Sequence, residues 1–297
     1  MDAAVHRAAE AQGRELVNRK TAEEPESKPA GGRALPDAMG SAPVSVREGY
    51  ERWAPIYDST PNPLLACEER HLSPLLVDLS KKRILDVACG TGRWLERVMA
   101  RGGPVGVGID CSAAMLRVAG RKDAIAGRLA RAACESLPFR AGAFDLAICS
   151  FALGHIRDLE GAARELARVT KPGAEVFLSD LHPEAHARGW RVGFRDGSGA
   201  VHIAMLPRVA EEIVAAFQAN GFECLARLSL CLGAPEEPIF ARAGKAHAFQ
   251  EACQIPAVLL CRFCRLDLPT GQDDDRSWSG GTRGFAGSRI SPAGIAF

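Results

Sequence analysis

The sequence predicts a doubly wound α/β fold, in which a mostly parallel sheet of seven strands carries helices on both faces. Short runs of β-branched residues alternate with helical segments over residues 44–266, the connections are short, and a glycine-rich turn follows the first strand. Such alternation is typical of a parallel sheet whose crossover helices cover both faces. We therefore expect one α/β domain over this range.

The individual elements follow from the local pattern in chain order. Strands are predicted at residues 82–87, 104–110, 129–134, 144–151, 174–180, 222–232 and 257–266. Helices are predicted at residues 92–101, 112–121, 159–169 and 208–220. Pro172–Gly173 and Asn220–Gly221 end the helices that precede them. The last two strands are expected to pair antiparallel and close one edge of the sheet.

Composition and charge narrow the classes of partner. The chain has 297 residues, of which 47% are hydrophobic and 25% charged, as in a globular protein with one sizeable core. A net charge of +1 gives no overall field for a nucleic acid or an anionic membrane, so we expect neither as a partner. Residues 1–43 and 267–297 hold few large apolar residues and are predicted to be disordered tails.

The ten cysteines do not form a disulfide pattern. Five of them, Cys149, Cys224, Cys231, Cys261 and Cys264, lie in apolar runs, where a free cysteine behaves as a small hydrophobic residue in a reducing compartment. Cys261 and Cys264 have metal-site spacing, but no second pair or histidine cluster accompanies them, so no metal is expected. No membrane span and no apolar leader region are found, and the expected location is cytoplasmic.

The sharpest motif is the segment Asp86–Gly92, which reads DVACGTG between a strand and a helix. Glycines at such a turn allow close approach of a ligand, and the helix start offers free N–H groups. The next strand ends in Asp110, where a carboxylate can accept hydrogen bonds from ribose hydroxyls. An alternative is that Asp86 and Asp110 only cap the helices that follow them.

The charge of the loop distinguishes two nucleotide-type cofactors. A dinucleotide fingerprint reads GxGxxG and leaves room for a pyrophosphate. Here the loop reads AxGxG, and Asp86 before it would repel a pyrophosphate but suit a cationic ligand such as S-adenosylmethionine. A nicotinamide-dependent oxidoreductase remains as the less favoured alternative.

With these motifs, the chain resembles the class I S-adenosylmethionine-dependent methyltransferases. It is most similar to the small-molecule enzymes of the ubiquinone/menaquinone-biosynthesis type, the methyltransferase type 11 family. Asp86–Gly92, Gly108–Leu116 and Glu135–Phe139 carry the resemblance, which is clear over residues 47–182. It implies a Rossmann-like methyltransferase fold, S-adenosylmethionine as cofactor, and methyl transfer to an oxygen or carbon of a small organic molecule.

The resemblance also implies a set of cofactor-binding residues. Asp110 would hold the ribose, and Cys111 and Met115 would flank the adenine, although Met115 could be a core residue instead. Tyr57 could contact the cofactor or only pack the lid. The full set is Tyr57, Asp86, Ala88, Gly90, Gly92, Asp110, Cys111, Met115, Cys134, Glu135 and Ser150. Two positions depart from the family: Ala88 stands where glycine is commoner, and Ala133 where an aspartate often binds adenine.

Methyl transfer mainly needs alignment of the acceptor, and a general base helps only when the acceptor loses a proton. His155 and His182 follow the fourth and fifth strands and are the candidate bases, with helix-start positions as their structural alternative. Residues 44–80 are expected to form lid helices and residues 182–206 a substrate cap. A non-catalytic cofactor-binding partner protein is a further alternative, and the acceptor and the oligomeric state stay open.

Overall fold

The computed structural model describes residues 42–103 and 105–267, which lie within one compact unit. The two predicted tails, 1–43 and 267–297, fall outside the described residues except for 42, 43 and 267. Among the described residues, no helix is both long and apolar enough to cross a membrane.

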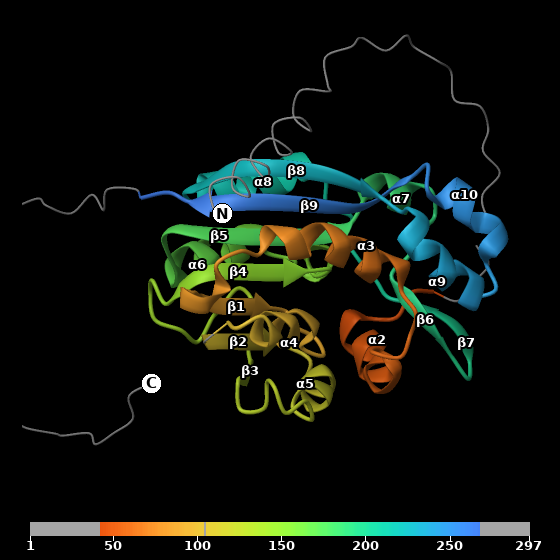
Figure 1. The fold of residues 1–297 in the computed structure, drawn as a ribbon, viewed down its shortest axis with the longest axis horizontal. Helices are drawn as coiled ribbons and strands as arrows, with labels where there is room; N and C mark the ends of the chain where they lie inside the picture. The colour runs from red at the N-terminus through yellow and green to blue at the C-terminus, as the bar shows by residue number, and fades with distance from the viewer. Residues whose placement is uncertain (1–41, 104, 268–297) are drawn as a thin grey trace, which may run out of the picture. The chain divides into compact units, whose positions relative to one another are not determined.

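A seven-stranded sheet confirms the predicted fold class (Figure 1). Its strand order is β3-β2-β1-β4-β5-β9-β8. The five strands from β3 to β5 are parallel, and β9 pairs antiparallel with both β5 and β8, as expected for the closing edge. The bounds are β1 (Arg83–Val87), β2 (Val105–Asp110), β3 (Leu129–Arg131), β4 (Phe144–Ser150), β5 (Thr170–Leu181), β8 (Phe222–Cys231) and β9 (Pro256–Arg265).

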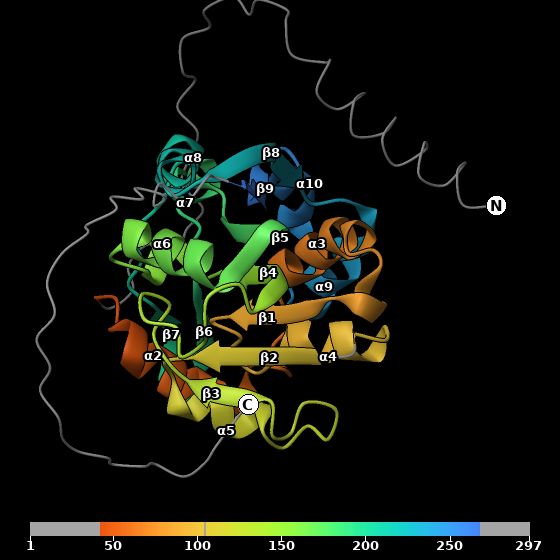
Figure 2. The ribbon, with the colours of Figure 1, turned by 90° about the vertical axis from the view of Figure 1, so that its left-hand side faces the viewer.

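Helices cover both faces of the sheet (Figure 2). On one face α6 (Leu159–Val169) and α8 (Ala210–Ala219) bury their apolar residues in one core cluster. On the other face α3 (Pro63–Leu72) and α4 (Arg93–Ala100) contribute to a second cluster. The remaining helices are α2 (Val46–Trp53), α5 (Ala113–Ala119), α7 (Pro183–Ala187), α9 (Glu237–Arg242) and α10 (Phe249–Ala252).

Side chains next to the helix starts set where several helices begin. The Asn62 side chain accepts the Leu64 N–H at 2.9 Å, and Pro63 occupies the first helical position of α3. Asp158 accepts the Gly161 N–H at 2.8 Å and begins α6. These local signals explain why the observed helix bounds differ from the predicted ones by a few residues at most.

The strand order creates a crevice beside β1. β1 pairs with β2 along one edge and with β4 along the other. The connections that follow β1 and β3 therefore run to opposite sides of β1, which makes the end of β1 a switch point. In open α/β sheets, ligands bind at the carboxyl ends of the strands beside such a switch point. In Figure 2 the arrowheads of β1 and β2 point toward the end where α2 and the strands β6 and β7 lie.

A two-stranded ribbon, β6 (Gly193–Asp196) and β7 (Gly199–His202), was not predicted. Each strand has only four residues, and the turn between them is rich in glycine, so the alternation is too short to be recognised. The ribbon packs against α2 rather than against the main sheet. Trp53 stacks on Phe194 with ring centroids 5.2 Å apart, and Arg52 pairs with Asp196 at 2.7 Å. Two distant segments thus form one small aromatic cluster.

Two strand predictions differ from the structure by more than one residue at an end. β5 begins at Thr170 rather than at residue 174, because the chain resumes pairing directly after α6 despite Pro172. β3 ends at Arg131 instead of residue 134, and the residues beyond it turn toward the crevice and line a cavity. Between β8 and β9, the short helices α9 and α10 occupy the long connection.

Candidate functional site

A cavity of about 540 Å³ lies at the carboxyl ends of β1, β2 and β4. This volume is in the range of small-molecule sites. The structure brings together ten of the eleven predicted cofactor residues in its lining, together with His155. They are Tyr57, Asp86, Ala88, Gly90, Asp110, Cys111, Met115, Cys134, Glu135 and Ser150.

The glycine loop takes an unusual backbone path after β1. Ala88, Gly90 and Gly92 have φ values of +54°, +57° and +79°. Alanine in this left-handed region costs about 1 kcal/mol, so the loop carries strain at Ala88. A Cβ on Gly92 would lie 2.3 Å from the Ile125 Cδ1 atom. Gly92 is absent from the cavity lining, and it lets the loop pack closely on the segment after α5.

Asp110 joins the two loops that form this end of the cavity. Its Oδ2 accepts the Gly90 N–H at 2.8 Å, and its Oδ1 accepts the Ser112 N–H at 2.7 Å. The N-cap of α5 is Ser112, whose hydroxyl accepts the Met115 N–H at 3.3 Å. Burial raises the pKa of Asp110, and the hydrogen bonds from the backbone oppose that shift. Asp110 therefore fixes the loop geometry and also lines the cavity.

Asp86 is almost completely buried, with 2% of its surface exposed. Its Oδ2 accepts the Leu95 N–H at 3.0 Å in the first turn of α4, so the helix-cap interpretation holds for this residue. Burial raises the pKa of Asp86 to about 7, opposed by the Leu95 hydrogen bond and the Arg93 charge. Because Asp86 also lines the cavity, a cation bound there would stabilise the charged form.

The opposite wall of the cavity combines sulfur, carboxylate and aromatic groups. The Cys134 thiol donates to Glu135 Oε2 at 3.3 Å. Met115 is 1% exposed and packs with Ala54 and Ala114 while it lines the cavity, so its core and site roles coexist. Burial raises the pKa of Tyr57 to about 12, which keeps its hydroxyl neutral.

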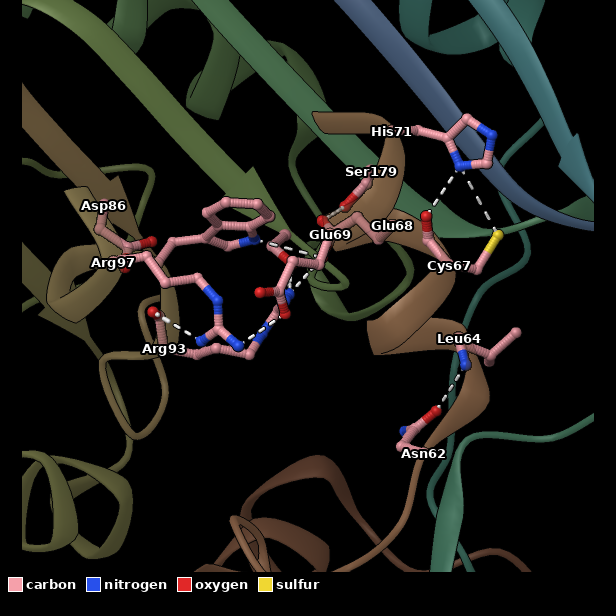
Figure 3. Close-up of polar contacts among 12 residues, drawn as sticks. Asn62, Leu64, Cys67, Glu68, Glu69, His71, Asp86, Arg93, Arg97 and Ser179 are labelled. Carbon is pink, nitrogen blue, oxygen red and sulfur yellow. Dashed lines mark hydrogen bonds and ion pairs between the residues drawn. The ribbon is translucent and has the colours of Figure 1, made fainter. Parts of the chain in front are cut away.

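A buried ion pair between Glu68 and Arg93 lies beside this cavity and was not predicted from the sequence. Glu68 on α3 has no exposed surface and pairs with Arg93 on α4. The Trp94 indole N–H donates to Glu68 at 3.1 Å, and the Ser179 hydroxyl on β5 donates to its other oxygen. Figure 3 shows Glu68 between Ser179 and Arg93. One carboxylate thus joins α3, α4 and β5.

A sequence signal for Glu68 did exist. Leu64, Glu68 and Leu72 are spaced by four and lie on one face of α3, so Glu68 interrupts an apolar stripe. Arg93 lines the cavity, and its Nη2 also donates to Ser150 Oγ at 3.0 Å. Its Nη1 atom is buried and makes no hydrogen bond within the described residues. This atom faces the Glu69 carboxylate at 4.0 Å.

The two candidate bases lie in different places. His155 ends the short 3₁₀ turn Leu153–His155 and lines the cavity, where its Nε2 is 3.0 Å from Tyr50 Oη. Burial lowers the pKa of His155 to about 4, so this histidine is neutral at pH 7. His182 caps α7, bonds Ser229 Oγ at 3.0 Å and is not part of the cavity lining. His182 therefore has no part in the mechanism proposed below.

Comparisons with known proteins agree with this geometry. Residues 85–178 match a family described as "Methyltransferase domain". Over 155 residues the chain is 34% identical to the demethylmenaquinone methyltransferase of Renibacterium salmoninarum, covering 49% of this chain and 63% of that one. Over 127 residues it is 38% identical to the ubiquinone biosynthesis O-methyltransferase of Ralstonia nicotianae, covering 39% of this chain and 53% of that one.

A solved structure supports the same fold. An S-adenosylmethionine-dependent methyltransferase from Mesorhizobium loti superposes with a TM-score of 0.53 and 22% identity, over 69% of this chain and 100% of that one. The strand order and the acid-lined crevice are those of a doubly wound α/β fold, which binds ligands at its switch point. Residues 85–178 match a methyltransferase domain, as the motifs predicted, and the chain shares its fold with a solved S-adenosylmethionine-dependent methyltransferase. It spans less than two thirds of the length of the relatives named here.

The Glu68→Gln substitution should strongly destabilise the fold. It leaves the buried Arg93 guanidinium without its counter-charge, which costs about 3–5 kcal/mol in comparable pairs. Glu184→Gln is the control, because the Glu184 side chain is 43% exposed and its ion pair with Arg188 is worth about 1 kcal/mol or less. Urea unfolding measures the free energy of unfolding of both variants. Equal losses would show that the buried pair stabilises the fold no more than an exposed pair does.

The Asp86→Asn substitution should raise stability at pH 8. The folded-state pKa of about 7 lies above the unfolded value, so the favourable contribution of protonated Asp86 is present near pH 4 and lost as pH rises through 7. The neutral amide avoids this loss, and we expect a gain of about 2–4 kcal/mol at pH 8. The gain should shrink steadily toward pH 4 in thermal melts, whereas exposed Asp123→Asn should change little at either pH.

Proposed function

We propose that this protein transfers a methyl group from S-adenosylmethionine to an oxygen or carbon of a small organic molecule. The observation that carries the proposal is the cavity beside β1, where Asp86, Asp110 and the glycine loop meet in a methyltransferase-family domain. When bound, the cofactor supplies a methyl group already activated by the positive sulfur.

The residues of the cavity fit this cofactor in charge and shape. Gly90 has a positive φ and leaves open space where a Cβ would stand, so the loop presents bare backbone. Asp110 retains lone pairs that can accept ribose hydroxyl hydrogens. Asp86 suits a cationic amino-acid end, and the Arg93 guanidinium, which also lines the cavity, suits its carboxylate. Met115, Cys111 and Cys134 give an adenine ring apolar and polarisable contacts.

In this proposal the protein chiefly positions the two reactants and excludes water. Tyr50, Phe151, His155 and Ile156 line the part of the cavity beside the end of β4 and would hold the acceptor. His155 is neutral and supplies a lone pair that can take a proton. The acceptor class is a small hydroxylated or quinone-like ring, by analogy with the relatives named demethylmenaquinone methyltransferase and ubiquinone biosynthesis O-methyltransferase.

Neither alternative function gains support. A nicotinamide dinucleotide would place a pyrophosphate at a loop flanked by Asp86, which repels it. A non-catalytic cofactor-binding protein remains an outcome of the same binding and turnover measurements. Among the described residues, no group of three or more His, Cys, Asp or Glu side chains is arranged to hold a metal ion.

We also propose that α2, the first helix of the expected lid region 44–80, acts as the lid and residues 182–206 as a substrate cap, whereas α3 in the same region packs in the core. α2 carries Tyr50 on the cavity wall, and the ribbon β6–β7 holds α2 through Trp53–Phe194 stacking and the Arg52–Asp196 pair. A Cβ on Gly49 would lie 2.6 Å from Ile203 Cγ1, so the helix and the segment after β7 pack without a gap. Lid and cap would therefore open together.

A cytoplasmic location is part of the proposal. All ten cysteines lie within the described residues and are free thiols. Disulfides are rare in reducing compartments, and so many unpaired thiols are typical of such a compartment.

The Asp110→Ala substitution should weaken S-adenosylhomocysteine binding at least about tenfold, because it removes the acceptor of two ribose hydrogen bonds. Calorimetric titration measures the affinity, with NAD and NADP as competing cofactors and exposed Asp123→Ala as the control variant. Wild-type protein should bind about one S-adenosylhomocysteine per chain. Saturable binding of NAD instead, or unchanged affinity in the variant, would contradict the proposed site.

The Arg52→Gln substitution should loosen the lid and the ribbon together. It removes the 2.7 Å ion pair to Asp196, and amide hydrogen exchange should then become faster in both 46–53 and 193–202. Arg188→Gln is the control, because its exposed pair with Glu184 lies on α7. Faster exchange confined to residues 46–53 would mean that the two segments move independently.

A further inference from the structure

Tyr50 and His155 form a hydrogen-bonded pair from segments 105 residues apart. Tyr50 Oη and His155 Nε2 are separated by 3.0 Å, and their rings meet edge to face with centroids 5.4 Å apart. Both side chains line the cavity. The hydrogen bond to His155 is the one that Tyr50 Oη makes among the described residues, so an oxygen lone pair is available to a ligand.

Each member of the pair is fixed by its own element. Asp180 at the end of β5 accepts the Gly154 N–H at 2.6 Å and so anchors the turn that carries His155. Tyr50 stacks on Trp53 within α2, with ring centroids 6.0 Å apart and an interplanar angle of 15°. The pair is therefore a preorganised contact between the lid and the end of β4, which is the geometry that a proton transfer needs.

The environment keeps both groups neutral. Burial raises the pKa of Tyr50 well above its usual value, helped by the nearby Tyr57, Asp180, Asp110 and Cys111. Burial lowers the pKa of His155, and the Ala204 backbone opposes that shift. Nδ1 of His155 is buried without a well-formed hydrogen bond among the described residues. The neutral phenol of Tyr50 can donate its proton to the neutral imidazole of His155 while it accepts a proton from a ligand.

We propose that Tyr50 and His155 form a relay that removes the hydroxyl proton of the methyl acceptor, so that the enzyme methylates oxygen. The inference rests on the proposed function and specifies the acceptor as a molecule with an ionisable O–H group. Tyr50 is the catalytic residue that touches the acceptor, and His155 is the terminal base.

The relay moves one proton from the acceptor through Tyr50 to His155. The acceptor O–H bond breaks, its proton binds Tyr50 Oη, and the phenolic proton of Tyr50 moves to His155 Nε2. The acceptor oxygen uses the freed electron pair to bond the methyl carbon, while the carbon–sulfur pair returns to sulfur. The positive charge of the sulfonium thus ends as an imidazolium, which loses its proton to water when the lid opens.

The first test needs no cofactor and no acceptor. The relay requires the His155 tautomer with hydrogen on Nδ1 and a lone pair on Nε2. ¹⁵N NMR of histidine-labelled full-length protein at pH 7 reports the tautomer, with His155→Gln assigning the signal and His186→Gln as the control. A lone pair on Nε2 that loses its hydrogen-bond shift in Tyr50→Phe supports the relay. An Nε2–H signal, or no change in Tyr50→Phe, overturns it.

The second test uses phenols of different acidity as probe acceptors, with S-adenosylmethionine. Phenol must lose a proton during transfer, whereas 4-nitrophenol is largely ionised at pH 8. We expect Tyr50→Phe and His155→Gln each to lower kcat for phenol about 100-fold and to lower kcat for 4-nitrophenol at least about tenfold less, because the ionised acceptor has no proton to lose. Their S-adenosylhomocysteine affinities should stay within about threefold of wild type, which also reports whether each variant folds.

Every result of the second test decides between the two proposals. Equal losses on both phenols would mean that the pair only shapes the cavity, and the relay would be overturned. Failure of wild-type protein to methylate any phenol, with S-adenosylhomocysteine still bound, also overturns the relay but leaves the methyltransferase proposal standing. Absence of S-adenosylhomocysteine binding would overturn the proposed function itself.

Discussion

The arrangement of the site depends on the buried ion pair between Glu68 and Arg93. Moving a carboxylate and a guanidinium out of water is costly, and the cost is offset only when their remaining donors and acceptors are satisfied. Here Trp94, Ser150 and Ser179 complete most of the network. The pair thereby fixes α3 and α4 against the sheet and holds Arg93 at the cavity wall.

Around this pair, the cavity concentrates carboxyl groups whose pKa values burial has raised. Asp86 and Asp110 line the cavity, and burial raises the pKa of both, that of Asp86 to about 7. Asp180 anchors the neighbouring turn that carries His155, and burial raises its pKa to about 6. A fold optimised only for stability would avoid such groups, because each charge is held in a poorly solvated position. Their concentration at one switch point is typical of a functional site, where a bound cation would relieve the cost.

The predicted cofactor residues meet in one cavity lining because they lie in short motifs at fixed places on strands and loops. A glycine loop after β1 and an acid at the end of β2 meet whenever the strands are neighbours, so their meeting follows from topology. Glu68, Arg93 and Tyr50 lie on helices, where a charge or a phenol reads as an ordinary surface or core residue. For Glu68 alone, the spacing of Leu64, Glu68 and Leu72 along one helix face indicated that the side chain is buried.

The sequence by itself determined the fold class, the strand alternation and the end of the cavity formed by the glycine loop, because hydrophobic periodicity and turn glycines are local properties. The tertiary structure decided the rest. It joined α2 to the ribbon β6–β7, put Tyr50 beside His155, and left His182 outside the cavity. These contacts join segments 47 or more residues apart, and no local pattern records which distant surfaces will pack together.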